Sequence, residues 1–461
     1  VDVADDLELG LATQKKAKEE LKKMGDKRQA EKQARAEAGE DDDEPVADVD
    51  EMKAKREAQL KQAEAPRFKL AAFDGLRKPE EYAKGTIMHK KAMKEGMLVW
   101  SGKQIPRSLT SLPTDKNKLA MGIFKALLGY MGDKQMQYPA TLAQDVLKQG
   151  VEIPELRDEI YIQMMKQLTQ NQVAASILKG WQLMCMCIST FPPTTGFENF
   201  LLNFLILQSK LHGIVGVYAR YSLRTLQGTL EGGASGFLPS IEEIMAYDER
   251  PPVLATIALV DGMILTEELP VTPDLNSGKV AEICAQFLEL QDERVDTMGI
   301  FVMDLGKDPK SKSDPDAGKP YVDLPRTPKP LRSDDFLGDA MVQWSRKKRL
   351  FKFVFKRKIY LPAQNGPSED QMFSRLVYLQ AEDEVINLGR LGFEDEAQVA
   401  ELAATSIAVA LGDEFPRDEA SLVEMEQPEL LEFLPFSWRS KGAKYWASKI
   451  SPFRAKLGID A

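Results

Sequence analysis

The sequence has few residues of the types that build disulfide frameworks, metal centres or histidine-based active sites. Its 461 residues include three cysteines and two histidines, His89 and His212, and neither histidine lies near a cysteine or near the other. A disulfide framework and a four-thiolate zinc site are therefore excluded, and no metal site or cofactor is expected. The cysteines, Cys185, Cys187 and Cys284, are expected to be buried small apolar side chains.

Long apolar runs are also missing. No uncharged apolar stretch reaches the roughly 18 residues that cross a bilayer. The first ten residues, VDVADDLELG, are acidic, whereas a signal peptide begins basic and then becomes apolar. We therefore expect a cytoplasmic protein. The acidic pairs are interpreted as charges that complement helix starts rather than as acid–base catalysts, so no enzyme is expected; they are Asp158-Glu159, Glu242-Glu243 and Asp334-Asp335.

Charge is distributed unevenly along the chain. The net charge of −10 divides into −6 for residues 1–66, +5 for residues 67–250 and −9 for residues 251–461. Residues 67–134 alone contain 14 basic and 6 acidic side chains. Such an excess attracts acidic partners, either a protein surface, nucleic acid or an anionic membrane. Nucleic acid is not expected, because the basic residues are not interleaved with aromatic residues that stack on bases.

The stretch 153–205 predicts two buried helices. In IPELRDEIYIQMMKQLTQNQ, four apolar residues recur every four positions, while the charged residues Arg157, Asp158, Glu159 and Lys166 fall mainly on the other faces. The next segment, from Ile177 to Phe191, is apolar on all sides and ends at Pro192-Pro193, which predicts a helix at the centre of a domain. The later GGASG run has phosphate-loop glycines but no following Lys-Ser/Thr, so it is interpreted as a flexible connector.

The pattern changes after Pro251-Pro252. VLATIALVDG and MILTEELPVT predict a hairpin around Asp261-Gly262, followed by a helix, a strand and the closing strand LFKFVFKRKIYLP. This order is typical of a ubiquitin-like roll. From Ser368 onward every segment is predicted to be helical.

Several motifs resemble known families. LRDEIYIQMMKQLTQNQ, KGWQLMCMCISTFPP and IFKALLGYMGD resemble the myosin tail homology 4 domain. A ubiquitin-like roll followed by a helical lobe is similar to the first two lobes of a FERM module. The strings DLPRTPKPLRSDDFLGDAMVQWSRKKRLFKFVFKRKIYLP and FSRLVYLQAEDEVI resemble the kinesin-like calmodulin-binding proteins of plants and green algae. The third FERM lobe, the motor head and the calmodulin-binding helix are expected to be absent from this sequence.

The expected fold class is mainly α with a smaller α+β part. Residues 1–66 are predicted to be a charged leader that is mostly disordered or a single helix, since so few apolar residues cannot offset the entropy of ordering. Residues 67–250 are predicted to be the helical myosin tail homology 4 domain, packed on a FERM module. Residues 251–362 are predicted to be its ubiquitin-like first lobe, and residues 363–461 its helical second lobe.

The resemblance implies a non-catalytic tail or adaptor region of a minus-end-directed kinesin that binds microtubules, with F-actin or cargo proteins as further partners. Because the surface of tubulin is acidic, the basic region offers a physical reason for such binding. The candidate microtubule-binding residues are Arg77, Lys78, Lys84, Lys90, Lys91 and Lys94. The alternative function is a cargo-peptide-binding tail like those of unconventional myosins, with the peptide in a cleft between the two modules. An anionic membrane is the least favoured partner, since the lobe that often contacts lipid is expected to be absent from this sequence.

A secondary basic cluster is predicted around the closing strand. Its members are Arg346, Lys347, Lys348, Arg349, Lys356, Arg357 and Lys358. Within the strand, Phe351, Phe353 and Phe355 alternate with basic residues. The phenylalanines are expected to face the core of the roll, and the basic residues other than Arg357 are expected to face outward.

Overall fold

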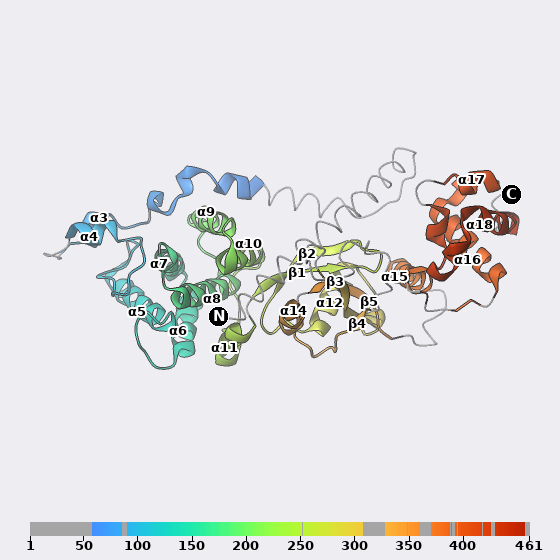
Figure 1. Cartoon of the computed structure of the whole chain (residues 1–461). Helices are drawn as coiled ribbons and strands as arrows, with labels where there is room; N and C mark the ends of the chain where they lie inside the picture. Colours follow the sequence, from blue (N-terminus) through green and yellow to red (C-terminus); the bar gives the residue numbers. More distant parts are fainter. Residues whose placement is uncertain are drawn as a thin grey trace.

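The computed structural model describes residues 58–84, 90–250, 252–307, 328–347, 349–359, 370–387, 389, 392–393, 395–416, 418–425 and 429–456. Figure 1 shows three parts in a row: a helical domain, a small sheet with its helices, and a helical lobe that contains α16–α18. Most of the predicted leader, residues 1–57, lies outside the described residues. Within the described chain, no helix combines the length and the apolar character needed to cross a membrane.

The first part of the chain is a helical domain. Its elements are η1 (Pro66–Phe68), η2 (Leu70–Ala72), α3 (Pro79–Tyr82), α4 (Lys90–Glu95), α5 (Thr114–Tyr130), α6 (Pro139–Glu152), η3 (Pro154–Leu156), α7 (Arg157–Leu168), α8 (Ala174–Thr190), α9 (Glu198–Ser209), α10 (Gly213–Gly232) and α11 (Ile241–Glu249). Helix α11 begins with a capping box at Ser240, whose hydroxyl accepts a hydrogen bond from the Glu243 N–H.

Helix α8 is the centre of this domain, as its sequence predicts. Trp181, Cys185 and Cys187 are completely or almost completely buried, and the helix ends immediately before Phe191 and the two prolines. Both cysteines are unpaired small side chains in the core, and so is Cys284 in the roll. The prediction for all three thiols is confirmed.

The last residues of the predicted leader belong to the folded domain. Residues 58–63 are helical and lie against α9. Ala63 is fully buried, and the Asn203 side chain of α9 donates a hydrogen bond of 2.8 Å to its carbonyl. Gln59 donates to Glu198, and Glu64 forms an ion pair with Lys210 at 2.8 Å. Packing on α9 therefore begins several residues before the predicted boundary at residue 66.

The second part is a five-stranded roll. Its elements are β1 (Val253–Ala258), β2 (Ile264–Val271), α12 (Ser277–Phe287), α13 (Asp292–Val295), β3 (Met298–Lys307), β4 (Lys329–Pro330), α14 (Leu337–Arg346) and β5 (Arg349–Arg357). The strand order is β2-β1-β5-β3-β4, in which β1 and β5 are parallel and the other pairs are antiparallel. A terminal hairpin whose first strand pairs in parallel with the last strand is the arrangement of a ubiquitin-like roll.

The third part divides between two cores. Its elements are α15 (Gln371–Glu382), η6 (Asp383–Asn387), α16 (Glu396–Leu411), η7 (Gly412–Glu414), α17 (Glu419–Val423), η8 (Leu430–Phe433), η9 (Phe436–Lys441), α18 (Ala443–Ile450) and α19 (Phe453–Lys456). Helix α15 packs on β5, and its Phe373 and Leu376 join the large core of the roll. Helices α16–α19 surround a separate core that includes Val399, Ile407 and Trp446. We call the part from α16 to α19 the C-terminal lobe.

The helical domain and the roll share one continuous apolar core. Helix α10 contacts β1 and β2, and the Arg250 guanidinium lies 3.8 Å from the centroid of the Phe336 ring. The same side chain reaches Asp339 of α14 at 3.9 Å. The overall class, mainly helical with a smaller mixed part packed against it, is the predicted one.

Candidate functional site

The basic side chains predicted as an interface lie on and around two short helices at one end of the molecule (Figure 1). Lys78 and Lys84 flank α3, and Lys90 and Lys91 begin α4; all four are exposed. Helices α3 and α4 contact each other. We call the exposed surface of α3 and α4, with these flanking lysines, the α3–α4 surface.

Acidic residues on the same helices reduce the positive charge of this surface. Lys94 of α4 donates a hydrogen bond of 2.9 Å to Glu80 of α3, and this contact holds the pKa of the Glu80 carboxyl below its ordinary value. Lys91 approaches Glu95 one turn later at 3.9 Å, but its side chain is 90% exposed. Residues 77–84 and 90–95 contain six basic and three acidic side chains. The surface is therefore basic but partly neutralised.

Arg77, the first residue of the predicted set, points into the protein. Its guanidinium donates to the Ser108 carbonyl at 3.0 Å, the Ser108 hydroxyl at 2.9 Å and the Thr110 carbonyl at 3.0 Å. These bonds fix the segment that precedes α5. Arg77 is therefore half-buried and structural, which corrects its assignment to the interface.

The segment fixed by Arg77 is also anchored to α7. The Glu159 carboxylate is fully buried and accepts hydrogen bonds from Leu109 N–H at 2.8 Å and from Thr110 N–H and hydroxyl, both at 2.6 Å. Gln163 donates to the same carboxylate at 2.8 Å. Two turns after Glu159, the buried Lys166 ammonium donates to the carbonyls of Gly96 and Val99, directly after α4. The expectation that the charged residues of α7 lie away from the buried face is therefore wrong for Glu159 and Lys166.

The secondary basic cluster does not form a single exposed patch. Lys356 is 4% exposed, because α15 and η6 cover the face of β5 that is opposite to the phenylalanines. Arg357, which alternates onto the same face as the phenylalanines, is 3% exposed. The Lys356 ammonium forms an ion pair of 3.0 Å with Glu384 of η6, and the Arg357 guanidinium lies 5.3 Å from the centroid of the Phe373 ring in α15. The prediction that Lys356 faces solvent is wrong, since a helix that follows the strand buries it.

The other members of this cluster are at the ends of the strand. Arg346 and Lys347 are exposed at the end of α14, and the Lys347 ammonium lies 4.1 Å from the centroid of the Trp344 ring. Lys358 is exposed after β5, with its ammonium 3.4 Å from the Ser333 hydroxyl. Arg349 begins β5, and Lys348 lies outside the described residues.

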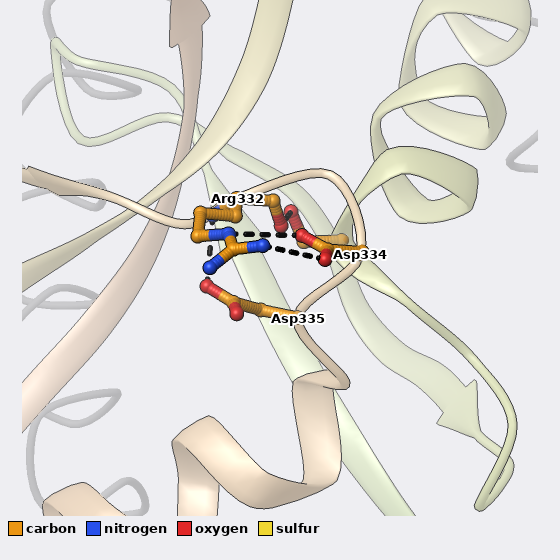
Figure 2. A network of polar contacts seen from close by, with 4 residues as sticks. Arg332, Asp334 and Asp335 are labelled. Carbon is orange, nitrogen blue, oxygen red and sulfur yellow. Dashed lines mark hydrogen bonds and ion pairs between the residues drawn. The ribbon is translucent and has the colours of Figure 1, made fainter.

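The acidic pairs considered as catalysts all hold loops or helix starts. Asp158 accepts from the Thr194 N–H at 2.8 Å and the hydroxyl at 2.6 Å, which anchors the loop after the two prolines. Figure 2 shows Arg332 between Asp334 and Asp335: its guanidinium bonds the Asp334 carboxylate at 2.8 and 3.1 Å, and its N–H donates to Asp335 at 2.8 Å. These bonds shape the turn that enters α14.

A groove lies between the helical domain and the roll, where the alternative function places a peptide cleft, but its lining residues were not predicted from the sequence. Its volume is about 570 Å³, and it is lined by Ser189 of α8, the last turns of α10, the GGASG run and Pro270 of β2. Strand β2 is at the edge of the sheet. Ser235 is held in the loop by a 2.6 Å hydrogen bond to the Thr190 carbonyl. The glycines that the sequence analysis interprets as a flexible connector therefore form one wall of this groove.

Comparisons with known proteins agree with the helical part of this description. Residues 143–246 match the family model of the MyTH4 domain, the myosin tail homology 4 domain. The part of the helical domain from residue 143 to residue 246 is thus similar to a MyTH4 domain, and the helical domain packs on the ubiquitin-like roll.

Similar curated proteins include both myosins and a kinesin. The high molecular weight form of myosin-1 from Acanthamoeba castellanii is 42% identical over 179 residues, which are 39% of this chain and 11% of that protein. The kinesin-like protein KIN-14I of Oryza sativa subsp. japonica is 26% identical over 350 residues, which are 71% of this chain and 26% of that protein. The chain thus spans only a small share of the length of these relatives.

The solved structures found in the comparison include MyTH4-FERM domains. The alignment with the myosin VII MF2 domain of Dictyostelium discoideum covers 79% of this chain and 72% of that domain, with a TM-score of 0.37 and 18% identity. The C-terminal MyTH4-FERM domain of human myosin 7b, solved in complex with the harmonin-a PDZ3 domain, covers 84% of this chain and 74% of its own length, with a TM-score of 0.35 and 20% identity.

Proposed function

We propose that this chain is a non-catalytic tail region of a kinesin-type cytoskeletal motor, and that the α3–α4 surface binds microtubules. The observation that carries the proposal is the group of exposed lysines, Lys78, Lys84, Lys90 and Lys91, on two short helices in a chain with a net charge of −10. The similarity to a kinesin over 71% of the chain supports the choice of motor class.

The packing below the α3–α4 surface also supports this function. Tyr82 of α3 is buried, and Lys166 anchors the carbonyls that follow α4. Short helices held in this way present their lysines in a fixed arrangement, so less side-chain and backbone entropy is lost on binding. Each exposed charge contributes about 1 kcal/mol or less, so binding requires several lysines acting together.

Co-sedimentation with microtubules tests the proposal. Lys78, Lys90 and Lys91 are replaced together by Glu; Lys94 is left unchanged because its reversal would place a second carboxylate beside Glu80. We expect the triple variant to bind at least tenfold more weakly, which corresponds to about 1.4 kcal/mol. Wild-type affinity should fall steeply as salt rises, because exposed charges are screened.

The matched control is reversal of three exposed lysines at the other end of the molecule, Lys444, Lys449 and Lys456. The change in net charge is the same, so a non-specific effect of charge would weaken both variants equally. If the α3–α4 variant pellets with microtubules as the wild type does, while circular dichroism shows a native fold, the surface is not the binding site. The same assay with F-actin tests that filament as a further partner.

The groove between the modules supports a second function, capture of a cargo peptide by a tail of the unconventional myosin type. It has a fixed wall, α10 and the loop 233–236, and on its other side the edge strand β2, where main-chain groups can pair with an added strand. The human myosin 7b domain was solved with a protein partner, the harmonin-a PDZ3 domain. Apolar and main-chain contacts in a groove resist salt better than an exposed charged surface.

A glycine on α10 offers a test of this second function. Gly228 lines the groove, and a Cβ added there would meet no atom within 4 Å, so Gly228→Trp fills the groove without disturbing the helix. Gly122 on α5 is equally open and far from the groove in sequence, so Gly122→Trp is the control. We expect only Gly228→Trp to abolish binding of cargo that resists high salt. Equal binding by both variants would exclude the groove.

A further inference from the structure

Helix α12 of the roll carries an apolar pair on its outer side. Its inner side packs on β3 and is buried; the buried residues include Val280, Ala281, Cys284 and Ala285. Ile283 and Phe287 lie outside this core and are 41% and 57% exposed. Because residues four positions apart on a helix are neighbours, the two side chains form one apolar strip. Covering such a strip with another segment of chain is favourable, since it removes apolar surface from water.

Acidic side chains lie beside this strip. Glu282 and Gln286 are exposed, and Gln286 lies three positions after Ile283, so this second row runs next to the first. Glu289 is exposed just after the end of α12, where the last carbonyl groups of the helix add partial negative charge. The exposed cation Lys279 lies in the first turn, at the other end of the helix. We call this side of α12 the α12 surface; it consists of Glu282, Ile283, Gln286, Phe287 and Glu289.

Helix α13 adds to the negative charge, because it contacts α12 and its Asp292 and Glu293 are exposed. Within the part of the chain that the structure describes, no ion pair joins these two carboxylates, or those of Glu282 and Glu289, to another residue. Their charge is therefore available to a ligand. An apolar strip beside unpaired carboxylates fits a basic segment that presents apolar side chains on one face.

The leader of this chain contains a segment of that kind. Residues 14–36, QKKAKEELKKMGDKRQAEKQARA, contain nine basic and four acidic side chains, although residues 1–66 as a whole have a net charge of −6. Leu21 and Met24 are three positions apart, so a helix would place them on one face, with Lys22 and Lys23 between them in sequence. The segment thus combines positive charge with two apolar side chains, which complements the α12 surface.

We propose that residues 14–36 dock on the α12 surface of the same chain. Leu21 and Met24 cover the apolar strip, and the lysines around them lie near the carboxylates of α12 and α13. This contact goes beyond the proposed microtubule function, because α12 belongs to the roll and the α3–α4 surface belongs to the helical domain (Figure 1).

The length of chain between the two partners permits this contact. The leader joins the folded domain near Gln59, which donates a hydrogen bond to Glu198 of α9. The 22 positions from residue 36 to residue 58 can span about 70 Å, whereas a domain of about 190 residues has a radius of gyration of about 16 Å. A tether of this length gives an effective concentration on the order of 1 mM, so modest complementarity is enough for docking.

Hydrogen exchange of the whole chain, followed by mass spectrometry, tests the proposal. The variant Ile283→Ser, Phe287→Ser removes the apolar strip from an exposed surface and leaves the core intact. We expect the amides of residues 14–36 to exchange at least about tenfold faster in this variant than in the wild type, because docking is lost. High salt should have a similar effect on the wild type, because it screens the charge pairs.

The matched control is Leu207→Ser, Leu211→Ser. These leucines are also four positions apart and are each 49% exposed, but they lie at the end of α9. Exchange in residues 14–36 should stay at the wild-type rate in this control. Equal rates in the wild type and the Ile283→Ser, Phe287→Ser variant would overturn the proposal, as would equal acceleration in the control. No microtubule is present, so failure here leaves the microtubule function untouched.

A charge exchange tests the register of the contact. Lys22→Glu, Lys23→Glu should speed exchange in residues 14–36, and the added changes Glu282→Lys, Glu289→Lys should slow it again, because opposite charges then meet once more. A quadruple variant that stays fast would show that these groups do not meet, and the proposal would be wrong. Slow exchange that appears only at protein concentrations where sedimentation shows a dimer would place the leader on a second copy and overturn docking within one chain.

Discussion

The Lys356 ammonium of β5 lies 3.0 Å from the Glu384 carboxylate of η6, and the Lys356 side chain is only 3% exposed. The pair connects the sheet to the helical segment that follows it. Gln380 of α15 strengthens the same junction, because its amide donates to the Arg357 carbonyl at 3.0 Å and accepts from the Arg357 N–H at 2.8 Å. A strand with basic residues on its outer face is thereby buried on both faces.

We predict that Glu384→Ala destabilises the protein by roughly 3 kcal/mol, because it leaves the buried Lys356 ammonium without its carboxylate. The double variant Lys356→Met, Glu384→Ala should be more stable than the single variant, since no unpaired charge is left buried. Urea unfolding followed by fluorescence measures both. If the double variant loses as much stability as Glu384→Ala and Lys356→Met lose together when each is measured alone, the two groups do not interact.

The exposed pair Lys91–Glu95 is the control for this prediction. Its atoms are 3.9 Å apart and its side chains are 90% and 67% exposed. Glu95→Ala should therefore change stability by no more than about 0.5 kcal/mol.

A second prediction concerns pH and Lys166. Burial lowers the pKa of the Lys166 ammonium to about 8, whereas the unfolded chain retains the ordinary value of 10.5. Between these values the unfolded state binds more protons, so the contribution of Lys166 to stability rises with pH. Over the whole interval the gain is up to about 3 kcal/mol.

Comparison with Lys166→Met isolates this group, because other groups that titrate in the same range are present in both proteins. The stability difference between wild type and Lys166→Met should shift in favour of the wild type as pH rises from 8 to 10.5 in denaturant titrations. A difference that stays constant across this range would mean that the folded-state pKa of Lys166 is not lowered.

Much of the fold could be predicted from the sequence, because apolar periodicity and turn residues act locally. The burial of α8, the hairpin before α12 and the Ser240 cap follow from residues within a few positions of each other. The strand order of the roll follows from its element order. In contrast, the burial of Glu159 depends on donors at residues 109 and 110, about fifty positions away.

The same limit explains which site residues were assigned wrongly. Arg77 and Lys356 look like solvent-facing charges in the sequence, but acceptors at Ser108, Thr110 and Glu384 come from other elements. No periodic pattern encodes such partners.

A third prediction compares two helical glycines. A Cβ on Gly150 of α6 would overlap the ring of the buried Phe191, whereas a Cβ on Gly122 of α5 would meet no atom within 4 Å. Gly150→Ala should therefore destabilise the protein by about 1–3 kcal/mol through overpacking. Gly122→Ala should stabilise it by up to about 1 kcal/mol, because alanine favours the helix. Thermal unfolding of both variants measures whether each substitution lowers or raises the stability. A Gly150→Ala variant as stable as the wild type would show that α6 does not lie this close to Phe191.

The last prediction is a gain of binding. Glu80 neutralises Lys94 on the α3–α4 surface through a 2.9 Å ion pair. Glu80→Gln removes one negative charge and releases the Lys94 ammonium toward a ligand, so microtubule affinity should rise by about two- to fivefold, which is equivalent to at most about 1 kcal/mol. The matched control is Glu64→Gln, which breaks the 2.8 Å pair with Lys210, directly after α9, and makes the same change in net charge. If both variants gain equally in co-sedimentation, the total charge and not the α3–α4 surface sets the affinity. If only Glu80→Gln gains, and the gain disappears at high salt, the lysines of α4 contact the acidic lattice directly.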